Sequence, residues 1–366
     1  MKVSDIAFFL ESLAPPTLQE HYDNAGLIVG NGTWDCRGIL CSLDATEEVI
    51  SEAIAKSCNL VVAHHPIVFG GIKKLNGKNY VEKAVITAVK NDVAIYAIHT
   101  NLDNVINGVN GKIAAVIGLQ KTSILLQKEN TLKKLFTFAP VAHSEQVRNA
   151  IFRAGGGNIG NYSECSFNVE GTGTFLAGEG TDPYVGNIGQ QHREIETKIE
   201  VVFPSWLETP IVTALRSAHP YEEVAYDIVN VSNNHEKVGS GLIGELPKPV
   251  EEIQFLGQLR ERFKLKVIRH TSLLNKPVKR VALCGGAGSF LVPKALNAGA
   301  DVYITADMKY HEFFDANGRM VIADIGHFES EQFTIDLLAE ILEQKFPNFA
   351  VLKTKTQTNP VHYFVG

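Results

Sequence analysis

Short apolar runs alternate with longer segments of helical periodicity along the first part of the chain. Strand-like runs occupy residues 38–43, 60–63 and 93–98, and apolar residues recur at helical spacing in residues 46–56 and 80–91. Strands that alternate with helices are typical of βαβ units, which build a parallel sheet. The pattern therefore predicts that the chain begins with an α/β fold.

The pattern changes after residue 126. A strand, a helix, three strands, a helix and a strand are predicted in turn at residues 132–140, 144–154, 165–169, 173–176, 195–203, 205–217 and 224–229. This order suggests two βαβ halves, which are typical of a small ferredoxin-like α+β domain. We expect that domain to span residues 127–237.

The α/β rhythm resumes at residue 238. Strands are predicted at residues 278–284, 301–305 and 321–325. The helices between and around them are expected at residues 249–263, 290–298, 309–317 and 331–346.

Histidine or carboxylate side chains follow three of the predicted strands. They are His64 with His65, His99 with Asp103, and His327 with Glu331. Loops at the carboxyl ends of strands are where α/β sheets usually bind what they act on. If a helix begins after Gly326, His327 and Glu331 share one of its faces, whereas Glu329 points away.

These side chains predict a metal site. Imidazole and carboxylate donors without cysteine suit Zn²⁺, which we favour, or Mn, Fe or Mg, and they indicate chemistry rather than a structural thiolate site. Because the side chains of His64 and His65 leave the backbone in opposed directions, we expect two divalent ions per chain, bridged by Glu331 or Asp103 at a separation of about 3.5–4 Å. The predicted ligands are His64, His65, Asp103, His327 and Glu331.

Two alternatives stay open for these histidines. Each could be a surface residue at a loop tip, which is the ordinary place for histidine when it stands alone. His99 could orient a ligand instead of contacting the metal.

The proposed ligands also determine the domain organisation. His64 and Glu331 can share a metal only if the first and last parts of the chain fold together. We therefore predict an α/β core with mainly parallel sheets, built from residues 1–126 and 238–366 and interrupted by the α+β insertion.

Composition excludes several classes of protein. With 45% hydrophobic and 20% charged residues the chain is globular, and a net charge of -6 argues against a binder of duplex nucleic acid. Five cysteines without Cys-x-x-Cys spacing fit reduced thiols. No apolar run approaches the roughly 20 residues that span a bilayer, and the amino-terminal apolar stretch is too short for a signal peptide. We expect a cytoplasmic protein without membrane contact.

A glycine-rich turn joins a predicted strand to a predicted helix. The backbone N–H groups of Gly285, Gly286, Gly288 and Ser289 are candidates for binding a phosphate, since such a turn can cradle an anion. The alternative is a tight turn that needs small residues. The motif is neither a Walker loop nor a dinucleotide fingerprint.

Three further motifs contain polar or titratable side chains whose roles need to be considered. Tyr310 and His311 are candidates for proton donation or substrate contact, the alternative being a capped helix start. Residues 23–26 are interpreted as a turn in which Asp23 caps its own backbone, the alternative being a role in the site, and residues 219–223 as structural.

The motifs occur in an order that resembles the GTP cyclohydrolase 1 type 2 homolog family, also called Ngg-interacting-factor-three-like, over essentially the whole chain. The matching motifs are Asp23-Asn24-x-Gly26-Leu27, Ser42-Leu43-Asp44-Ala45-Thr46, Ala63-His64-His65-Pro66, His99-Thr100-Asn101-Leu102-Asp103, Cys284-Gly285-Gly286, Asp307-Met308-Lys309-Tyr310-His311 and Gly326-His327-x-x-x-Glu331. The inserted run resembles the PII-like or CutA-like insertion of the longer bacterial members. Tyr22, where tryptophan is common, and Ala306, where glycine is usual, depart from the pattern.

The resemblance implies a dinuclear divalent-metal site at His64, His65, Asp103, His327 and Glu331, and a ring-shaped homohexamer. Our leading hypothesis is a metal-dependent hydrolase that attacks C8 of the guanine of GTP, opens the imidazole ring and releases formate. The triphosphate would lie on residues 285–289, and His99 and His311 would transfer protons. The alternative is a metal-containing regulatory or metabolite-binding hexamer without turnover. A ring around nucleic acid ranks last because the chain is acidic.

Overall fold

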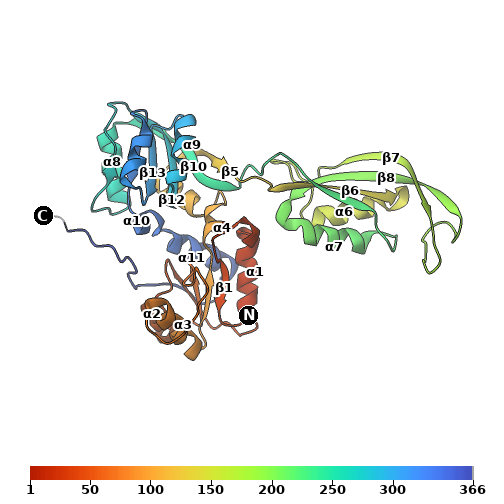
Figure 1. Cartoon of the computed structure of the whole chain (residues 1–366), viewed down its shortest axis with the longest axis horizontal. Coiled ribbons are helices and arrows are strands. Elements are labelled where there is room, and N and C mark those ends of the chain that lie inside the picture. Colours follow the sequence, from red (N-terminus) through yellow and green to blue (C-terminus); the bar gives the residue numbers. More distant parts are fainter. Residues whose placement is uncertain (365–366) are drawn as a thin grey trace. The chain divides into compact units, whose positions relative to one another are not determined.

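The computed structural model describes residues 1–364 and divides into two compact units. The first unit combines Met1–Leu126 with Lys237–Gly366, and the second is Gln127–Glu236 (Figure 1). The second unit is therefore an insertion into the first. Its carboxyl-terminal boundary lies one residue before the predicted one.

One sheet of the first unit has five strands in the order β1-β4-β3-β2-β15. Their bounds are β1 (Gly26–Val29), β2 (Ile39–Ser42), β3 (Leu60–Ala63), β4 (Ala94–Ala97) and β15 (Val351–Lys353). The strands from β4 to β15 are parallel, and β1 is antiparallel to β4.

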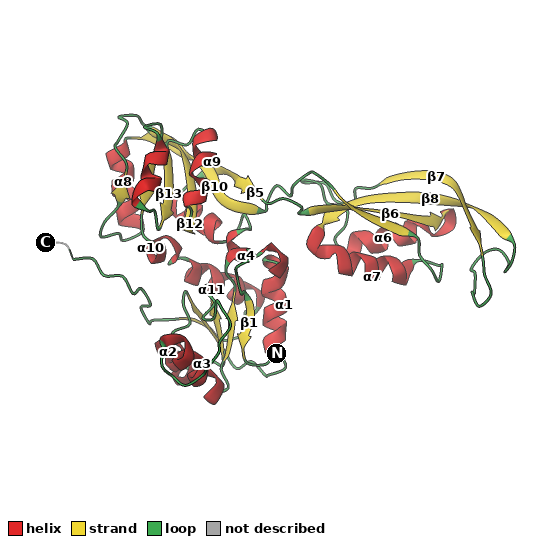
Figure 2. Ribbon diagram, in the orientation of Figure 1, coloured by secondary structure: helices red, strands yellow, loops and turns green. Residues whose placement is uncertain are grey.

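Helices cover both faces of this sheet (Figure 2). Helices α2 (Glu47–Ala55) and α3 (Tyr80–Lys90) pack on one face, and α1 (Val3–Leu13) and α11 (Thr334–Lys345) pack on the other. Along β3, Val61 faces α2 and α3, whereas Leu60 and Val62 face α1 and α11. Because successive side chains of a strand alternate between faces, a strand covered on both sides is apolar throughout, which explains the continuous runs in the sequence.

The other sheet of the first unit has six strands in the order β11-β14-β13-β12-β10-β5. Their bounds are β5 (Gln120–Gln127), β10 (Gly239–Val250), β11 (Arg269–His270), β12 (Val278–Ala287), β13 (Val302–Ala306) and β14 (Val321–Asp324). Strands β12, β13 and β14 are parallel, while β10 and β11 add antiparallel pairs.

Helical segments also cover the six-stranded sheet. Helices α5 (Val109–Ile117) and α8 (Glu252–Arg262) share a hydrophobic core with one of its faces, and α9 (Val292–Asn297) shares a core with the other. Three short 3-10 segments are η1 (Pro16–Leu18), η4 (Ser289–Leu291) and η5 (Tyr310–Ala316). Residues of both sheets belong to one buried cluster, in which Val62 and Val281 lie together with Leu338 of α11. The two sheets are therefore joined by a continuous core.

The inserted unit has the element order β-α-β-β-α-β around a four-stranded sheet. Its elements are β6 (Leu132–Pro140), η2 (Val141–His143), α6 (Ser144–Arg153), β7 (Phe167–Leu176), β8 (Gln191–Pro204), η3 (Ser205–Leu207), α7 (Glu208–Ala218) and β9 (Tyr226–Asn230). The strands pair antiparallel in the order β7-β8-β6-β9, and both helices pack on one face through Ile151, Leu215 and their neighbours. This is the order expected for a ferredoxin-like domain. His219 donates from Nε2 to the carbonyl of Phe138, a structural contact within this unit.

Several elements differ from the prediction. The strand-like runs predicted separately at residues 165–169 and 173–176 belong to one strand, β7, which begins at Phe167. A Cβ at Gly173 would lie 2.1 Å from a carboxylate oxygen of Glu196, the flexible end of a side chain on the neighbouring strand β8. The predicted helix at 331–346 is two helices, α10 (His327–Glu331) and α11, and the predicted helix at 309–317 is the 3-10 segment η5. The elements α1, β1, α5, β5, β10 and β15 were not predicted.

Candidate metal centre

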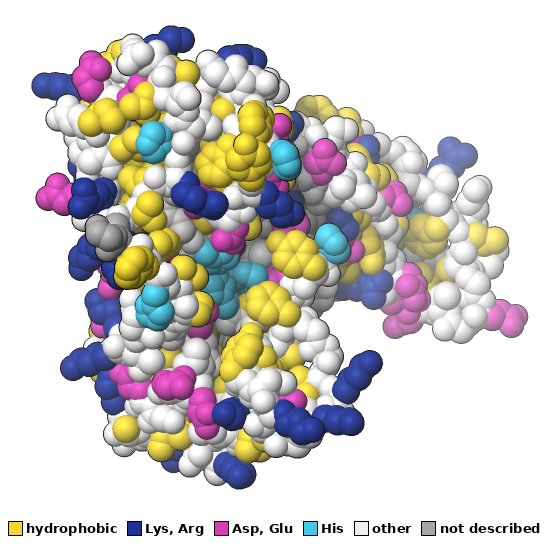
Figure 3. All heavy atoms as spheres, turned by 60° about the vertical axis from the view of Figure 1, so that its left-hand side comes forward, with side chains coloured by type: hydrophobic (Ala, Val, Ile, Leu, Met, Phe, Trp, Pro, Cys, Tyr) yellow, Lys and Arg dark blue, Asp and Glu magenta, His cyan; other side chains and the backbone are white. Residues whose placement is uncertain are grey.

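The predicted ligands lie at the carboxyl ends of strands from both sheets. His64 and His65 follow β3 directly, and Asp103 ends the short helix α4 (Thr100–Asp103) after β4. His327 and Glu331 begin and end α10, which follows β14. Histidine side chains gather in a hollow on the face shown in Figure 3. The fold thus brings together residues that are far apart in the sequence, such as His65 and Glu331, which are 266 positions apart.

One group of donor atoms, the outer triad, consists of His65, His327 and Glu331. Glu331 Oε2 lies 2.9 Å from His65 Nε2 and 3.1 Å from His327 Nε2. The two imidazole nitrogens are 3.4 Å apart. Three donor atoms at this spacing can converge on one cation.

A second group, the inner triad, consists of His64, Asp103 and Glu331. His64 is fully buried, and its Nε2 lies 3.7 Å from Asp103 Oδ1 and 3.9 Å from Glu331 Oε1. His64 Nδ1 is 2.8 Å from the carbonyl oxygen of Ile98, which can only accept, so Nδ1 carries the proton and Nε2 carries a lone pair.

The hydrogen bonding of the inner triad indicates that it is suited to binding a cation. His64 Nε2 and Asp103 Oδ1 are both buried and have no hydrogen-bond partner among the described residues. Burying a polar atom without a partner costs free energy. A lone pair that faces carboxylate oxygens is stabilised by a cation placed between them.

Burial and charge set the protonation of the inner triad. Burial lowers the pKa of His64 to about 3, so this imidazole is neutral at physiological pH and available as a ligand. Burial and the neighbouring charge of Glu331 raise the pKa of Asp103 well above its usual range. A divalent cation beside Asp103 would stabilise its ionised carboxylate and so lower this raised pKa.

Carboxylates support both imidazoles of the outer triad from behind. His65 Nδ1 lies 2.8 Å from Asp44 Oδ1, and His327 Nδ1 lies 2.6 Å from Asp307 Oδ2. Such contacts fix the orientation and tautomer of metal-binding histidines. Asp44 and Asp307 were not predicted as site residues.

The carboxylates outweigh burial in the outer triad. Burial alone lowers the pKa of a histidine, but Asp44 and Glu331 raise the pKa of His65 to about 10, and Glu331 and Asp307 raise that of His327 to about 9. Burial works against ionisation of Glu331, but hydrogen bonds from His327 and His65 hold its pKa well below the usual range. The triad therefore favours positive charge, and a cation competes with protons for it.

His99 is paired with a carboxylate that the sequence analysis had placed in a turn. His99 Nδ1 lies 2.7 Å from Asp23 Oδ1, and the Thr100 amide donates to Asp23 Oδ2 at 3.0 Å. Burial opposes ionisation of Asp23, but hydrogen bonds from His99 and Thr100 lower its pKa to about 2. Asp23 also accepts from the amide of Asn24, so the predicted capping of its own backbone is present as well. His99 lies near His64 and His65, as either a ligand or a proton-transfer group requires.

The glycine-rich turn packs directly against the triads. The amides of Gly285 and Gly286 donate to Asn110 Oδ1 at 2.9 Å and to Ser330 Oγ at 3.0 Å, so these two groups already have partners. Gly286 has a φ of 62°, and a Cβ there would lie 2.4 Å from Glu331 Oε1. This geometry gives the turn a structural reason for glycine, and its phosphate-binding role stays a prediction.

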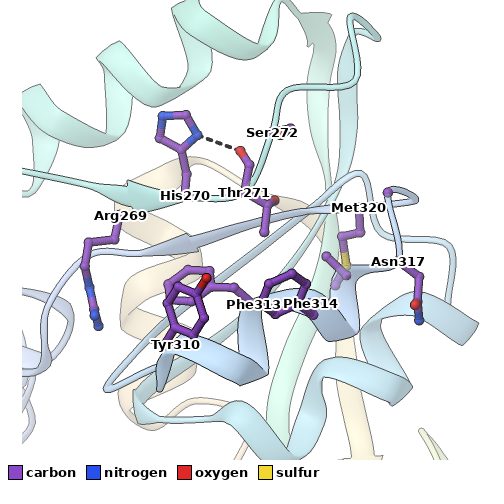
Figure 4. A pocket seen from close by; sticks show the side chains of 11 residues that line it. Arg269, His270, Thr271, Ser272, Tyr310, Phe313, Phe314, Asn317 and Met320 are labelled. Atoms are coloured by element: carbon purple, nitrogen blue, oxygen red, sulfur yellow. Dashed lines mark hydrogen bonds between the residues drawn. The ribbon is translucent and has the colours of Figure 1, made fainter.

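Tyr310 and His311 lie on η5, after Asp307. The ring of His311 packs against those of Tyr310 and Phe314, with centroids 5.1 and 6.3 Å away. Tyr310 lines a cavity of about 410 Å³ together with Arg269 and Phe313 (Figure 4). The residues lining this cavity include no member of either triad. The proposed proton transfer by His311 also stays a prediction.

The fold and these clusters define a class of protein, an α/β protein with two sheets whose side chains converge in groups suited to binding metal. The chain belongs to the Duf34/NIF3 (NGG1p interacting factor 3) family, whose family model matches residues 1–360. This confirms the resemblance inferred from the motifs. Among the described residues, every helix is too short or too polar to span a lipid bilayer.

Relatives and solved structures match nearly the whole chain. A Halalkalibacterium halodurans protein named GTP cyclohydrolase 1 type 2 homolog is 36% identical over 355 residues, covering 96% of this chain and 95% of that protein. A Bacillus subtilis protein of the same name is 34% identical over 356 residues, with coverage of 96% and 95%. The crystal structure of a Bacillus cereus protein related to NIF3 has a TM-score of 0.87 and 37% identity, covering 100% of this chain and 99% of that one.

Proposed function

We propose that the chain binds two divalent metal ions, one in each triad. His64, Asp103 and Glu331 would hold the first ion, and His65, His327 and Glu331 would hold the second. The observation that carries this proposal is the pair of buried atoms without partners, His64 Nε2 and Asp103 Oδ1. Imidazole and carboxylate donors favour Zn²⁺, with Mn, Fe and Mg as the alternatives.

The proposed activity is that of a metal-dependent hydrolase that opens the imidazole ring of the guanine of GTP and releases formate. The names of the relatives and the hydrolytic character of the ligand set support this reaction. Bound divalent ions supply Lewis acidity, which brings the pKa of water down to about 7.

Residues beside the triads have separate proposed roles in that reaction. Asp23 accepts a hydrogen bond from His99 Nδ1, so Nε2 is the nitrogen of His99 that is proposed to exchange a proton with the substrate. His311 is the second candidate for proton transfer. The phosphates of the substrate are proposed to contact the turn at Gly285, Gly286, Gly288 and Ser289, where the amides of Gly285 and Gly286 already have partners.

The remaining proposals concern the inserted unit, the oligomeric state, the cellular location and the ligand. We propose that the inserted unit is a PII-like or CutA-like domain, that the protein assembles as a homohexamer and that it acts in the cytoplasm. The β-α-β-β-α-β order of the insertion supports the first of these. The ligand is proposed to be a small phosphorylated or nucleotide molecule.

The test measures formate and pterin release from GTP by protein loaded with Zn²⁺. We expect turnover that disappears in His65→Ala and in Glu331→Ala. The control is Glu329→Gln, which changes a neighbouring carboxylate of α10 outside both triads. No product from wild-type protein that holds two ions would exclude the reaction while leaving the metal centre intact.

A second candidate function is a regulatory protein that binds a metabolite without turnover. The inserted unit favours it, since it contains its own cavity of about 620 Å³ lined by Phe175, Tyr184, Tyr221 and Glu196. Tight GTP binding without product, measured by calorimetry on the same metal-loaded protein, would support this function over the hydrolase.

A further inference from the structure

The segment after β15 is held by the side chains of three residues from other parts of the first unit. It runs from Thr354 to Tyr363, and we call it the strap. At its start, the amide of Thr354 donates to the carbonyl of Cys41, which continues the pairing of β15 with β2. The strap therefore follows β2 toward Asp44, the residue behind His65.

The first anchor of the strap is Glu52 on α2. Its carboxylate accepts hydrogen bonds from the amides of Lys355 and Thr356 at 2.9 and 3.1 Å, and from the hydroxyl of Thr356 at 2.7 Å. The side chain of Glu52 is 13% exposed, so these bonds are shielded from water. The start of the strap is thus fixed to the five-stranded half of the unit.

The second anchor joins the strap to the outer triad. Thr358 donates its hydroxyl proton to Asp44 Oδ2, while the other oxygen, Oδ1, accepts from His65 Nδ1. His65 Nε2 in turn faces Glu331. A line of hydrogen bonds thus runs from Thr358 through Asp44 to the metal-facing nitrogen of His65.

The third anchor lies on the helix that carries the other ligands of the outer triad. Asn359 Nδ2 donates to Glu329 Oε1 at 3.1 Å, and the hydroxyl of Tyr363 also hydrogen-bonds Glu329. Glu329 stands between His327 and Glu331 on α10. The strap therefore contacts the five-stranded sheet and α10, on either side of the outer triad.

We propose that Thr358 is a positioning residue for the metal ion of the outer triad, and that it acts by fixing the carboxylate of Asp44. This inference rests on the proposed metal centre. A carboxylate with one oxygen bonded to an imidazole can still rotate about its own axis, and a hydroxyl on the second oxygen removes that freedom. In the inner triad, His64 Nδ1 is instead held by a backbone carbonyl, that of Ile98.

The experiment titrates Zn²⁺ into metal-stripped protein and records the visible absorption spectrum of the Co²⁺-loaded form. Thr358→Val keeps the side-chain shape but removes the hydroxyl. We expect it to weaken Zn²⁺ affinity at one of the two sites about tenfold and to shift the Co²⁺ spectrum. Loss of a residue that hydrogen-bonds a metal ligand typically lowers metal affinity by about tenfold to a hundredfold. Thr358→Ser restores the hydroxyl and should restore both readouts.

Thr356→Val is the matched control. It makes the same substitution in the same strap, but the lost hydroxyl contacts Glu52, which is not bonded to a proposed ligand. We expect it to lower the melting temperature without changing Zn²⁺ affinity or the Co²⁺ spectrum. An equal loss of affinity in Thr356→Val would overturn the proposal, since loosening of the whole strap would then explain it.

Asp44→Asn adds a double-mutant cycle that remains informative if a single variant is less stable. Thr358→Val should weaken Zn²⁺ binding no further once Asp44 is changed, because both act through His65. Additive losses overturn the proposal, as does unchanged Zn²⁺ binding in Thr358→Val. A wild-type protein that binds no Zn²⁺ instead overturns the metal centre, which distinguishes the two failures.

Discussion

The inner and outer triads share Glu331 but differ in the burial and the hydrogen bonding of their donor atoms. The side chain of His64 in the inner triad is 0% exposed, whereas those of His65 and His327 in the outer triad are 16% and 41% exposed. Two inner donor atoms, His64 Nε2 and Asp103 Oδ1, have no hydrogen-bond partner among the described residues, whereas the outer imidazoles are bonded on both nitrogens. The inner triad is thus suited to a cation because two of its buried donor atoms have no other partner among the described residues. The outer triad is suited to one because carboxylates surround its imidazoles.

Removing the shared residue should give the largest effect. Glu331→Ala takes one oxygen from each triad, so we expect metal content to fall from about two ions per chain to none, as measured by elemental analysis after purification. Glu329→Gln should keep both ions. Retention of one ion in Glu331→Ala would show that one of the two triads binds its ion without Glu331.

Single histidine changes should separate the triads. His64→Ala should remove the inner ion and His65→Ala the outer one, so that each variant binds one Zn²⁺ in calorimetric titration. His64→Ala should also lower stability, by about 2–4 kcal/mol in urea unfolding, since it opens a cavity at a fully buried position. Loss of both ions in both variants would contradict independent filling.

The pH dependence of binding should differ between the same two variants. In His64→Ala the remaining outer triad binds metal in competition with protons on His65 and His327, whose pKa values are about 10 and 9. Since both groups are protonated below pH 9 without metal, affinity should rise up to a hundredfold per pH unit between about pH 6 and 8.

The inner triad should respond less to pH. In His65→Ala the imidazole of His64, with a pKa of about 3, stays neutral across that range, and Asp103 alone competes for a proton. Its affinity should rise at most tenfold per pH unit. Equal slopes for the two variants in Zn²⁺ titrations would show that the triads do not differ in protonation.

A substitution in the glycine turn should affect the inner triad most. Gly286→Ala places a Cβ against Glu331 Oε1, the oxygen that faces His64, so we expect inner-site Zn²⁺ affinity to fall about tenfold. The control is Gly299→Ala, which also has a left-handed φ, of 72°, but no atom within 4 Å of the new Cβ. Both should lose about 1 kcal/mol of stability from backbone strain, and only the first should lose metal.

The smallest expected effect on metal binding concerns the strap behind the outer triad. Hydrogen bonds from Lys56 and the strap hold the pKa of Glu52 well below its usual range although burial opposes this. A lowered folded-state pKa adds stability that is complete above the unfolded pKa of about 4.3 and is lost as pH falls toward the folded value. Glu52→Gln should therefore cost about 2 kcal/mol at pH 7 and less at pH 3, measured by urea unfolding. Outer-site Zn²⁺ affinity should change less than threefold; a larger change would give this anchor a direct part in the site.

Strands covered on both faces were the part of the fold that sequence revealed best. The apolar runs before His64, His99 and His327 could be recognised because both faces of β3, β4 and β14 are buried. Strand β10, by contrast, contains Gly239, Gly241 and Gly244 and two prolines, and its apolar pattern is too interrupted to stand out.

The carboxylates behind the histidines were not predicted as site residues, although the sequence places Asp307 on the same rim as the metal loops. Asp307 directly follows β13, and Asp44 stands two residues after β2, so the rule that found the histidines also applies to them. The pairing of Asp23 with His99 had no such signal, because Asp23 follows no strand. Contacts of this kind depend on how the sheets pack, which short-range periodicity does not encode.

The separation of His65 and Glu331 by 266 positions has a consequence for biosynthesis. The two adjacent histidines leave the ribosome long before their carboxylate partner, and the whole inserted unit is translated in between. Neither triad is complete until α10 has been made and has docked on the earlier half. Occupancy of the proposed metal centre would thus report that both halves of the discontinuous unit have met, and chains that stop short of α10 would display the histidine pair without its carboxylate partner.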